Sequence, residues 1–292
     1  MWQQQSYRDS EGGKLYLVPT PIGNLEDMTY RAVKVLQDAD LIAAEDTRHT
    51  RKLCNAFEIT APVVSYHEHN KEKSGIRLIQ DIQEGKTVAL VSDAGMPSIS
   101  DPGFELVQAA LQEQMPVIPL PGANAALTAL IASGLKPQPF YFFGFLNRNK
   151  KERREQLKRL SKMEDTIIFY EAPHRLKNTL LDIEKVLGSR RIVLSRELTK
   201  KFEEFIRGTV QEALEWVNQN EVRGEFCVLV EGGEKSNGEE PAWWDALSVI
   251  EHVEHYLSEE GLKPKEAVKK AAEDRSMPKR EVYQIYHVEN ED

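Results

Sequence analysis

Cysteine is scarce in this chain, and its scarcity excludes two classes of protein. Cys54 and Cys227 are the two cysteines among 292 residues. They cannot form a disulfide framework or a four-cysteine zinc site, and a reducing cytoplasm is the compartment they favour. Long apolar runs are also missing: no stretch approaches the about 18 residues of a transmembrane helix. Residues 1–14 are polar and lack the apolar core of a signal peptide, so we expect neither membrane contact nor export.

Several catalytic motifs are absent too. The sequence contains no GxxxxGK[ST] loop, no GxGxxG after its first predicted strand, no HExxH and no GxSxG. P-loop nucleotidases, common dinucleotide-binding enzymes, zincins and α/β-hydrolases are thereby excluded. His67 and His69 alternate as ligands on a strand can, but no third ligand accompanies them. We therefore expect a polar loop there and no bound metal.

Positive charge is locally concentrated, although the chain as a whole has a net charge of −9. Residues 203–260 carry 15 Asp or Glu and three Lys or Arg, whereas residues 148–162 carry eight Lys or Arg and two Asp or Glu. A second basic cluster comprises Lys263, Lys265, Lys269, Lys270, Arg275, Lys279 and Arg280. Such clusters indicate either solvated helix faces or a surface that binds nucleic-acid phosphates.

The N-terminal half alternates apolar runs with amphipathic segments. A frayed tail is predicted over 1–13. Strands are predicted at 14–18, 40–46, 87–92 and 116–120, and helices at 29–36, 74–83, 104–113 and 124–133. Asp101, followed by Pro102, is predicted to cap the third helix. Continuous apolar strands that alternate with helices indicate a mostly parallel α/β domain over 14–134.

The pattern restarts after residues 134–139. Strands are predicted at 140–145, 166–171, 191–197, 203–208 and 226–231, with helices that include 149–161 and 174–187. They indicate a second α/β domain of mixed strand order over 139–233. A polar linker is predicted over 234–242, and a helical domain over 243–288 with helices near 245–258, 264–274 and 278–287. The last two helices resemble a helix-turn-helix, which either binds nucleic acid or is a packing appendage.

Three turns rich in Gly, Pro and Ala follow predicted strands of the first domain. They are PTPIGN (19–24), SDAGMPSISDPG (92–103) and LPGANAA (120–126). Ligands of open α/β sheets bind at this edge, where small residues let them approach the backbone. The turns therefore predict a pocket for a nucleoside or an amino-acid-like ligand.

The order of the motifs resembles that of a known family. The ribosomal RNA small subunit methyltransferase I family, a branch of the tetrapyrrole (corrin/porphyrin) methylases, begins with a segment similar to LYLVPTPIGNLEDMTYRAVKVLQDADLIAAEDTR. The match continues in order through SDAGMPSISDPG, LPGANAALTALIASGL, FYFFGFL, FYEAPHR and SRELTKKFEE. The resemblance covers roughly residues 14–233, and the helical tail resembles the C-terminal helical domain of the same family.

The resemblance implies an α/β fold with two domains of the tetrapyrrole methylase type, S-adenosylmethionine in the cleft between them, and a small C-terminal helical domain. It implies a homodimer that methylates the ribose 2′-oxygen of a cytidine in the decoding region of 16S rRNA, within the small ribosomal subunit. The cofactor-binding residues that it implies are Pro21, Gly23, Asp93, Gly95, Pro97, Ser98, Ile99, Ser100, Pro121, Gly122, Asn124, Ala125 and Ala126. Many tetrapyrrole methylases have Asp where this chain has Met96, and this departure argues against a tetrapyrrole substrate.

A ribose hydroxyl is a weak nucleophile, so a base or a charge stabiliser assists its methylation. The candidates near predicted strand ends are Glu45, Asp46, Glu171, Glu197 and Lys200, together with Arg48, His174, Arg175 and Arg196. Each has a structural alternative: Asp46 can cap a helix, Glu171 can bond backbone, and Lys200 can hold phosphate. Positioning and desolvation without a base are a further alternative.

RNA contacts are predicted for the basic helix of the second domain. The residues concerned are Arg148, Lys150, Lys151, Arg153 and Arg154. On this hypothesis, Glu at positions 153 and 154 weakens binding of the ribosomal substrate without changing the cofactor affinity. Two other functions remain open, a methylase of a tetrapyrrole-like small molecule and a non-catalytic RNA-binding protein.

Overall fold

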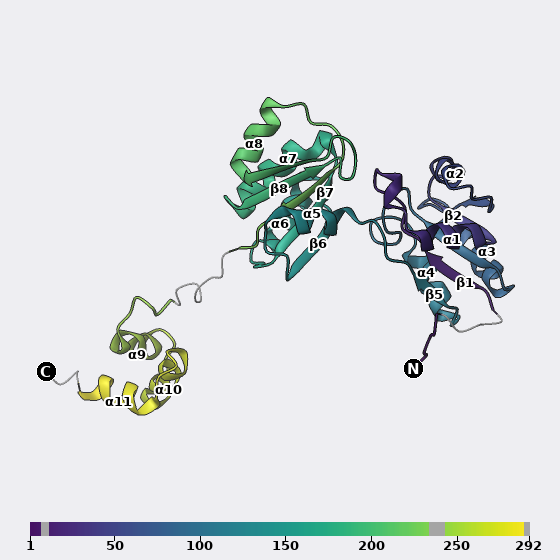
Figure 1. The fold of residues 1–292 in the computed structure, drawn as a ribbon. Coiled ribbons are helices and arrows are strands. Elements are labelled where there is room, and N and C mark those ends of the chain that lie inside the picture. Colours follow the sequence, from purple (N-terminus) through teal and green to yellow (C-terminus); the bar gives the residue numbers. More distant parts are fainter. Residues whose placement is uncertain (7–11, 234–242, 289–292) are drawn as a thin grey trace. The chain divides into compact units, whose positions relative to one another are not determined.

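A computed structural model describes residues 1–6, 12–233 and 243–288 of the chain. Its contacts divide the chain into two compact units, Met1–Gly233 and Glu234–Asp292. The first unit contains two five-stranded sheets, and the described part of the second is helical (Figure 1). The linker predicted over 234–242, and residues 7–11 of the predicted tail, lie outside the described residues.

The first sheet is parallel throughout, as predicted, with the strand order β3-β2-β4-β1-β5. Its strands are β1 (Lys14–Leu17), β2 (Leu41–Ala44), β3 (Val63–Ser65), β4 (Thr87–Val91) and β5 (Val117–Pro119). Around it lie η1 (Leu25–Asp27), α1 (Tyr30–Asp38), α2 (Thr47–Ala56), α3 (Lys71–Gln83) and α4 (Phe104–Gln112). Ala89 and Val91 of β4 belong to a core shared with α1 and α2, whereas Val88 and Leu90 belong to one shared with α3 and α4. The alternation of side chains along β4 thus buries both faces of the sheet.

One expectation for this half is wrong. Asp101 does not cap α4, because the helix begins at Phe104 and Gly103 occupies the N-cap position. Gly103 has a φ of +150°, and a Cβ there would lie 2.1 Å from the Ser98 Oγ. Within the predicted tail, the Gln4 side chain donates to the Val117 carbonyl and accepts from the Val117 N–H, each at 2.9 Å. This pair satisfies backbone groups on the outer strand β5.

The second sheet has the order β6-β7-β10-β8-β9, in which strands are not in sequence order, as predicted. Strands β6 and β7 are parallel, and the remaining pairs are antiparallel. Its strands are β6 (Phe140–Phe145), β7 (Thr166–Glu171), β8 (Arg191–Arg196), β9 (Glu204–Thr209) and β10 (Phe226–Val230). One face packs against α6 (Lys150–Leu160), α7 (Pro173–Leu187) and α8 (Val210–Gln219). The other face packs against α5 (Ala125–Ser133), which follows the first sheet in sequence. The turn at residues 120–126 leads into α5, so this helix connects that turn to the second sheet.

The second unit contains α9 (Val249–Ser258), α10 (Pro264–Asp274) and α11 (Lys279–Val288). Val253, Tyr256, Val268, Ala271 and Val282 belong to a core of its own. The short connection between α10 and α11 matches the predicted helix-turn-helix-like arrangement.

Candidate functional site

Three turns at the carboxyl ends of neighbouring strands form one side of a cleft. They follow β1, β4 and β5, which are adjacent in the first sheet. The Thr20 N–H donates to the Gly95 carbonyl at 3.0 Å, and the Gly95 N–H donates to the Thr20 carbonyl at 2.9 Å. The third turn comes so close to the first that a Cβ on Gly122 would lie 2.7 Å from the Pro19 Cβ. The predicted convergence of the three turns is thereby confirmed.

The cleft has a volume of about 530 Å³, and both halves of the first unit line it. The first half contributes Ile22, Glu45, Asp93, Ala94, Gly95, Met96, Ile99, Ser100, Asp101, Asn124 and Ala125. The second half contributes Phe145, Tyr170, Glu171, Ser195, Glu197, Leu198, Lys200, Gly224, Glu225, Phe226 and Cys227. Six of the residues proposed to bind cofactor are therefore on the wall: Asp93, Gly95, Ile99, Ser100, Asn124 and Ala125.

The other proposed cofactor residues are not among those that line the cleft. They are Pro21, Gly23, Pro97, Ser98, Pro121, Gly122 and Ala126. Gly23 leaves room for Lys200, whose Cγ would be 2.5 Å from a Cβ at position 23. The Ala126 N–H donates to the Tyr170 hydroxyl at 3.2 Å and so links the start of α5 to β7. These positions shape and brace the turns, whereas the lining residues are the ones that a ligand can touch.

Carboxyl groups gather at the end of the cleft formed by the first sheet. Burial, together with the negative charges of Asp101, Asp93 and Asp46, raises the pKa of Glu45 from 4.5 to about 7. Burial, with Asp93 and Glu225, raises the pKa of Asp101 from 3.8 to about 6. Like charges disfavour ionisation of both side chains. This end of the cleft can therefore accept a proton near neutral pH and also favours a cationic ligand.

Two proposed catalytic carboxyls have structural partners instead. Asp46 caps α2 by accepting from the Arg48 N–H at 2.8 Å, and its side chain pairs with the Arg48 guanidinium at 2.8 Å. That pairing lowers the pKa of Asp46. Glu171 is 1% exposed and accepts hydrogen bonds from the Ala172 N–H and the Thr179 hydroxyl, at 2.9 and 2.5 Å. Arg175 lies 3.1 Å from the same carboxylate. Both carboxyls therefore have the structural roles that the sequence left open.

The loop after β8 brings the other two candidates to the cleft. Glu197 and Lys200 both line it and pair with each other at 3.1 Å. Glu197 and Thr199 have positive φ angles of 51° and 67°. Left-handed backbone is unfavourable for these residue types, and such conformations concentrate at functional sites. The strained loop places an ion pair on the cleft wall, where it can contact a substrate.

A row of side chains from the second sheet forms the opposite wall. Tyr170, Cys227 and Ser195 are direct neighbours across β7, β10 and β8. Burial raises the pKa values of Tyr170 and Cys227, which keeps both groups uncharged at neutral pH. Ser195 is completely buried, and its Oγ has no hydrogen-bond partner among the described residues. This row of three side chains is thus uncharged, and Ser195 adds to it one hydroxyl without a partner among the described residues.

A basic groove of about 740 Å³ runs between α6 and α7. Its lining includes Arg148, Lys150, Arg153, Arg154, His174, Arg175 and Lys185. Lys150 and Lys151 are exposed, as phosphate contacts require. Helix α7 contributes His174, Arg175 and Lys185, which extend the basic surface beyond the segment singled out from the sequence.

Arg153 does not fit the role of a phosphate contact. It is 6% exposed, and its Nε and Nη2 donate to the Asp182 carboxylate at 2.8 and 2.6 Å. Arg154 donates to the same carboxylate at 2.5 Å. The expectation that Glu at positions 153 and 154 would affect RNA binding alone is therefore corrected. Those changes also break a buried ion pair that connects α6 to α7.

The second basic cluster is partly neutralised within its own unit. Lys270 pairs with Glu260 at 2.5 Å, and Lys269 pairs with Glu273 at 3.5 Å. Arg275 donates to the Nδ1 of the buried His252 at 3.0 Å. Three of the seven basic residues of this cluster thus have partners within the helical unit, and the groove on α6 and α7 is the stronger candidate for RNA.

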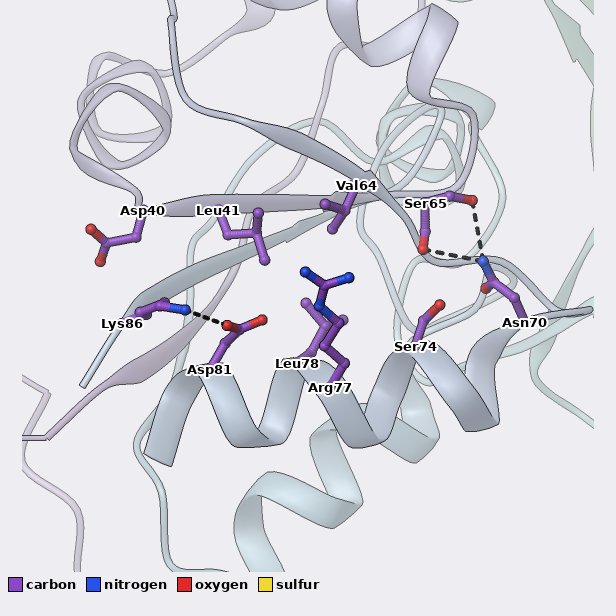
Figure 2. Close-up of a pocket in the computed structure, with 10 residues that line it drawn as sticks. All are labelled: Asp40, Leu41, Val64, Ser65, Asn70, Ser74, Arg77, Leu78, Asp81 and Lys86. Atoms are coloured by element: carbon purple, nitrogen blue, oxygen red, sulfur yellow. Dashed lines mark hydrogen bonds and ion pairs between the residues drawn. The ribbon is translucent and has the colours of Figure 1, made fainter. Parts of the chain in front are cut away.

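Another hollow, of about 570 Å³, lies between α3 and the strands β2 and β3 (Figure 2). Arg77 projects across it from α3, and Lys86 pairs with Asp81 at 2.5 Å. The Asn70 side chain donates to the Ser65 carbonyl at 3.2 Å. None of the three turns reaches this hollow, so it is not the candidate catalytic site.

Neither a metal centre nor a membrane span is found in the part of the chain that the structure describes. No group of three or more His, Cys, Asp or Glu side chains there is arranged to hold a metal ion. No helix among the described residues is long and apolar enough to cross a membrane.

Sequence reasoning missed Asp101, Glu225, Tyr170 and Ser195 as lining residues. Asp101 was interpreted as a helix cap. Ser195 is a polar residue within the apolar strand β8, and strand alternation places it on the same face as Val193. The serine that follows the apolar residues 192–194 is the sequence signal that could have indicated this part of the site.

Comparison with known proteins agrees with this architecture. Residues 14–214 match the family model described as Tetrapyrrole (Corrin/Porphyrin) Methylases. The chain is 60% identical over 280 residues to the ribosomal RNA small subunit methyltransferase I of Bacillus subtilis, covering 96% of each chain. It is 58% identical to the protein of that name from Halalkalibacterium halodurans, covering 99% of this chain and all of the relative. The corresponding Synechocystis protein is 47% identical over 94% of this chain and 97% of the relative.

Solved structures share the fold of the first unit. A cobalt-precorrin-4 methyltransferase of cobalamin biosynthesis superposes with a TM-score of 0.59 at 20% identity, covering 75% of this chain and 94% of the other. A uroporphyrin-III C-methyltransferase from Thermus thermophilus, in complex with S-adenosylhomocysteine, superposes with a TM-score of 0.56 at 20% identity. That superposition covers 76% of this chain and 98% of the other.

Proposed function

Because the chain belongs to the ribosomal RNA small subunit methyltransferase I family of the tetrapyrrole methylases, we propose that it methylates the ribose 2′-oxygen of a cytidine in the decoding region of 16S rRNA. It is an rRNA methyltransferase, and its methyl donor is S-adenosylmethionine. The observation that carries the assignment is the 60% identity along 96% of both chains. The substrate is the small ribosomal subunit.

The residues of the cleft fit S-adenosylmethionine. The carboxyls of Asp93 and Asp101 complement its sulfonium and ammonium charges, and the turns at Gly95 and Ala125 offer backbone groups. Ser195 offers a buried hydroxyl that has no partner among the described residues. The bound cofactor supplies an electrophilic methyl group, so the protein must align an oxygen with that methyl and remove a proton.

We propose that Glu45 accepts the proton of the 2′-hydroxyl. Its carboxyl lines the cleft, and its pKa of about 7 leaves it partly ionised at neutral pH while making it a stronger base than an ordinary glutamate. Burial raises that pKa most, and the negative charges of Asp101 and Asp93 raise it further. The pair of Glu197 and Lys200 lies on the wall from the second half and would orient the ribose.

We expect Lys150→Glu combined with Lys151→Glu to weaken binding of small ribosomal subunits by about tenfold or more, because each exposed lysine contributes phosphate attraction. Filter binding at two salt concentrations measures the loss and the reduced salt dependence. Affinity for S-adenosylhomocysteine, measured by calorimetry, should stay unchanged.

The matched control for this pair is Lys34→Glu with Lys52→Glu, which makes the same charge change on exposed positions of α1 and α2. If the control weakens subunit binding as much as the test pair, the attraction comes from overall charge and the groove on α6 and α7 is not the RNA surface.

We also propose a homodimer. Leu127 and Ile131 lie four residues apart on one face of α5 and are 46% and 82% exposed. Apolar side chains exposed in this way favour burial against a second copy. Light scattering should give twice the 33.3 kDa of one chain, and Ile131→Asp should shift the protein to the monomer mass. A monomeric wild-type protein would contradict this proposal.

The proposed acceptor is tested against the small-molecule alternative in one reaction. Labelled S-adenosylmethionine is supplied with undermethylated small ribosomal subunits and with a uroporphyrinogen-type tetrapyrrole. We expect label in the RNA fraction. Label in the tetrapyrrole fraction would support the alternative, and absence of cofactor binding would support a non-catalytic RNA-binding protein.

A further inference from the structure

We propose that Phe202 stacks against an unpaired base of the RNA strand that enters the cleft, with Lys201 beside it as a phosphate contact. The inference rests on the proposed RNA substrate and assigns part of its binding to a named loop. This loop, residues 197–203, joins β8 to β9 and supplies Glu197 and Lys200 to the lining of the cleft. Phe202 lies in the loop and is 73% exposed.

The loop at residues 197–203 is braced by its own contacts. The Thr199 N–H donates to the Glu203 carboxylate at 2.7 Å, and the Glu203 N–H donates to the Lys200 carbonyl at 3.0 Å. Leu198 is buried and belongs to the core on the α5 side of the second sheet. The ring of Phe202 is therefore presented to solvent by a loop that is anchored on one side of it and hydrogen-bonded across it.

The residues around Phe202 favour a nucleic acid over a protein partner. The Lys201 ammonium lies 5.7 Å from the centre of the Phe202 ring. The other exposed residues of the loop are Lys200, Lys201 and Glu203, so the loop offers no wider apolar patch of the kind that protein interfaces use. An aromatic face beside cationic side chains matches a nucleotide, which combines a flat base with a phosphate.

The position of the ring suits the reaction. Methylation of a 2′-oxygen requires the ribose to enter the cleft, because the oxygen must be aligned with the methyl group of the cofactor. A nucleotide that enters leaves its stack, and the lost stacking opposes binding. Aromatic side chains that bind single-stranded RNA compensate for this loss, since bases stack on their faces. Phe202 follows the cleft residue Lys200 by two positions, a distance of at most about 7 Å along the chain.

The carboxyls of the cleft increase the value of such a contact. Glu45, Asp93 and Asp101 line the cleft, and ionised carboxylates repel the phosphates of an approaching strand. Stacking does not depend on the charge of the backbone, so Phe202 can hold a base where phosphate attraction is weakened. Lys201 adds positive charge at the same place.

The test compares Phe202→Ala, Phe202→Leu and Phe202→Trp by filter binding of small ribosomal subunits. The alanine variant loses one stacked base, so its Kd should rise by about fivefold to 150-fold. The leucine variant should lose affinity to a similar degree, because leucine is apolar but has no flat ring. Tryptophan supplies a larger ring and should keep the Kd within about twofold of the wild type.

Phe140→Ala is the matched control, since Phe140 is also an exposed phenylalanine of the second half, at 40%. It begins β6, whereas Phe145 at the other end of this strand lines the cleft. The control should bind subunits as the wild type does. Affinity of Phe202→Ala for S-adenosylhomocysteine should be unchanged, because Phe202 is not among the residues that line the cleft.

The inference is overturned if Phe202→Ala binds subunits as tightly as the wild type, or if leucine preserves affinity as well as tryptophan does. It is also overturned if Phe202→Ala changes the mass measured by light scattering, since the ring would then contact a second copy of the chain. In each of these cases the wild type still methylates the subunits, so the proposed function is unaffected. A wild-type protein that neither binds nor methylates them would refute the proposed function and this inference together.

Discussion

Glu45→Gln is expected to lower kcat for methyl transfer by about two to four orders of magnitude, the usual contribution of a general base. The glutamine keeps the size of the side chain but cannot accept the proton of the ribose hydroxyl. Transfer of labelled methyl groups to small ribosomal subunits measures the loss. Affinity for S-adenosylhomocysteine should change little, because Asp93 and Asp101 remain in the cleft.

The pH dependence of the methyl-transfer rate is a second test of the role of Glu45. The wild-type rate should rise as pH increases through about 7, where Glu45 loses its proton, and the variant should lack this rise. Glu72→Gln, an exposed change in the first turn of α3, is the control and should keep the wild-type profile. A wild-type profile that is flat between about pH 5.5 and 8 would contradict a base of raised pKa.

The same pKa shift predicts that the stability of the folded protein falls as pH increases, whereas the rate of methyl transfer rises. The folded chain binds the Glu45 proton more tightly than the unfolded chain, since the pKa rises from 4.5 to about 7 on folding. Stability is therefore lost as pH increases through that window. Glu45→Gln removes the unfavourable charge, so it should raise the melting temperature of the ligand-free protein at about pH 8, by roughly 2 to 4 °C, and by less at about pH 5.

Arg153→Glu is expected to destabilise the protein by at least about 3 to 5 kcal/mol, the cost of breaking a buried ion pair. The Asp182 carboxylate is 1% exposed and receives three hydrogen bonds from Arg153 and Arg154. A glutamate at position 153 would remove two of them and place a second buried carboxylate beside the first. Urea unfolding followed by circular dichroism measures the change.

Lys150→Glu makes the same charge reversal on an exposed position of the same helix and is the control. Its stability should stay within about 0.5 kcal/mol of the wild type, as is usual for surface changes. If Arg153→Glu is as stable as this control and loses only RNA binding, Arg153 is a phosphate contact and its structural role is wrong.

The sequence was sufficient to predict most of the sheets. The predicted strands at 87–92 and 226–231 became β4 and β10, because both faces of these strands are covered and residues 88–91 and 226–230 are apolar. The three-residue strand β3 was missed, since so short a run has no period of its own. Helix α8 was predicted without bounds, although Thr209 and Glu212 form its capping box, because the strand before it ends at that same threonine.

The sequence was sufficient to predict the turns of the candidate site, but not which other side chains line the cleft. Gly95 pairs with Thr20 and has a φ of +79°, and Gly122 leaves room for the ring of Pro19, so both requirements are visible as a residue type. The roles of Arg153 and Ser195 depend on which element lies opposite, Asp182 of α7 in one case and the cleft in the other. Such pairings between distant segments are determined by tertiary packing, so a local pattern cannot distinguish a buried arginine from an exposed one.

The central claim is tested most directly by identifying the methylated nucleoside. Small ribosomal subunits that lack the modification are incubated with the protein and labelled S-adenosylmethionine, and the 16S rRNA is digested to nucleosides. We predict that the label elutes with 2′-O-methylcytidine from a decoding-region fragment. Label in a base-methylated nucleoside, or unlabelled RNA from a protein that binds the cofactor, would contradict the proposed reaction.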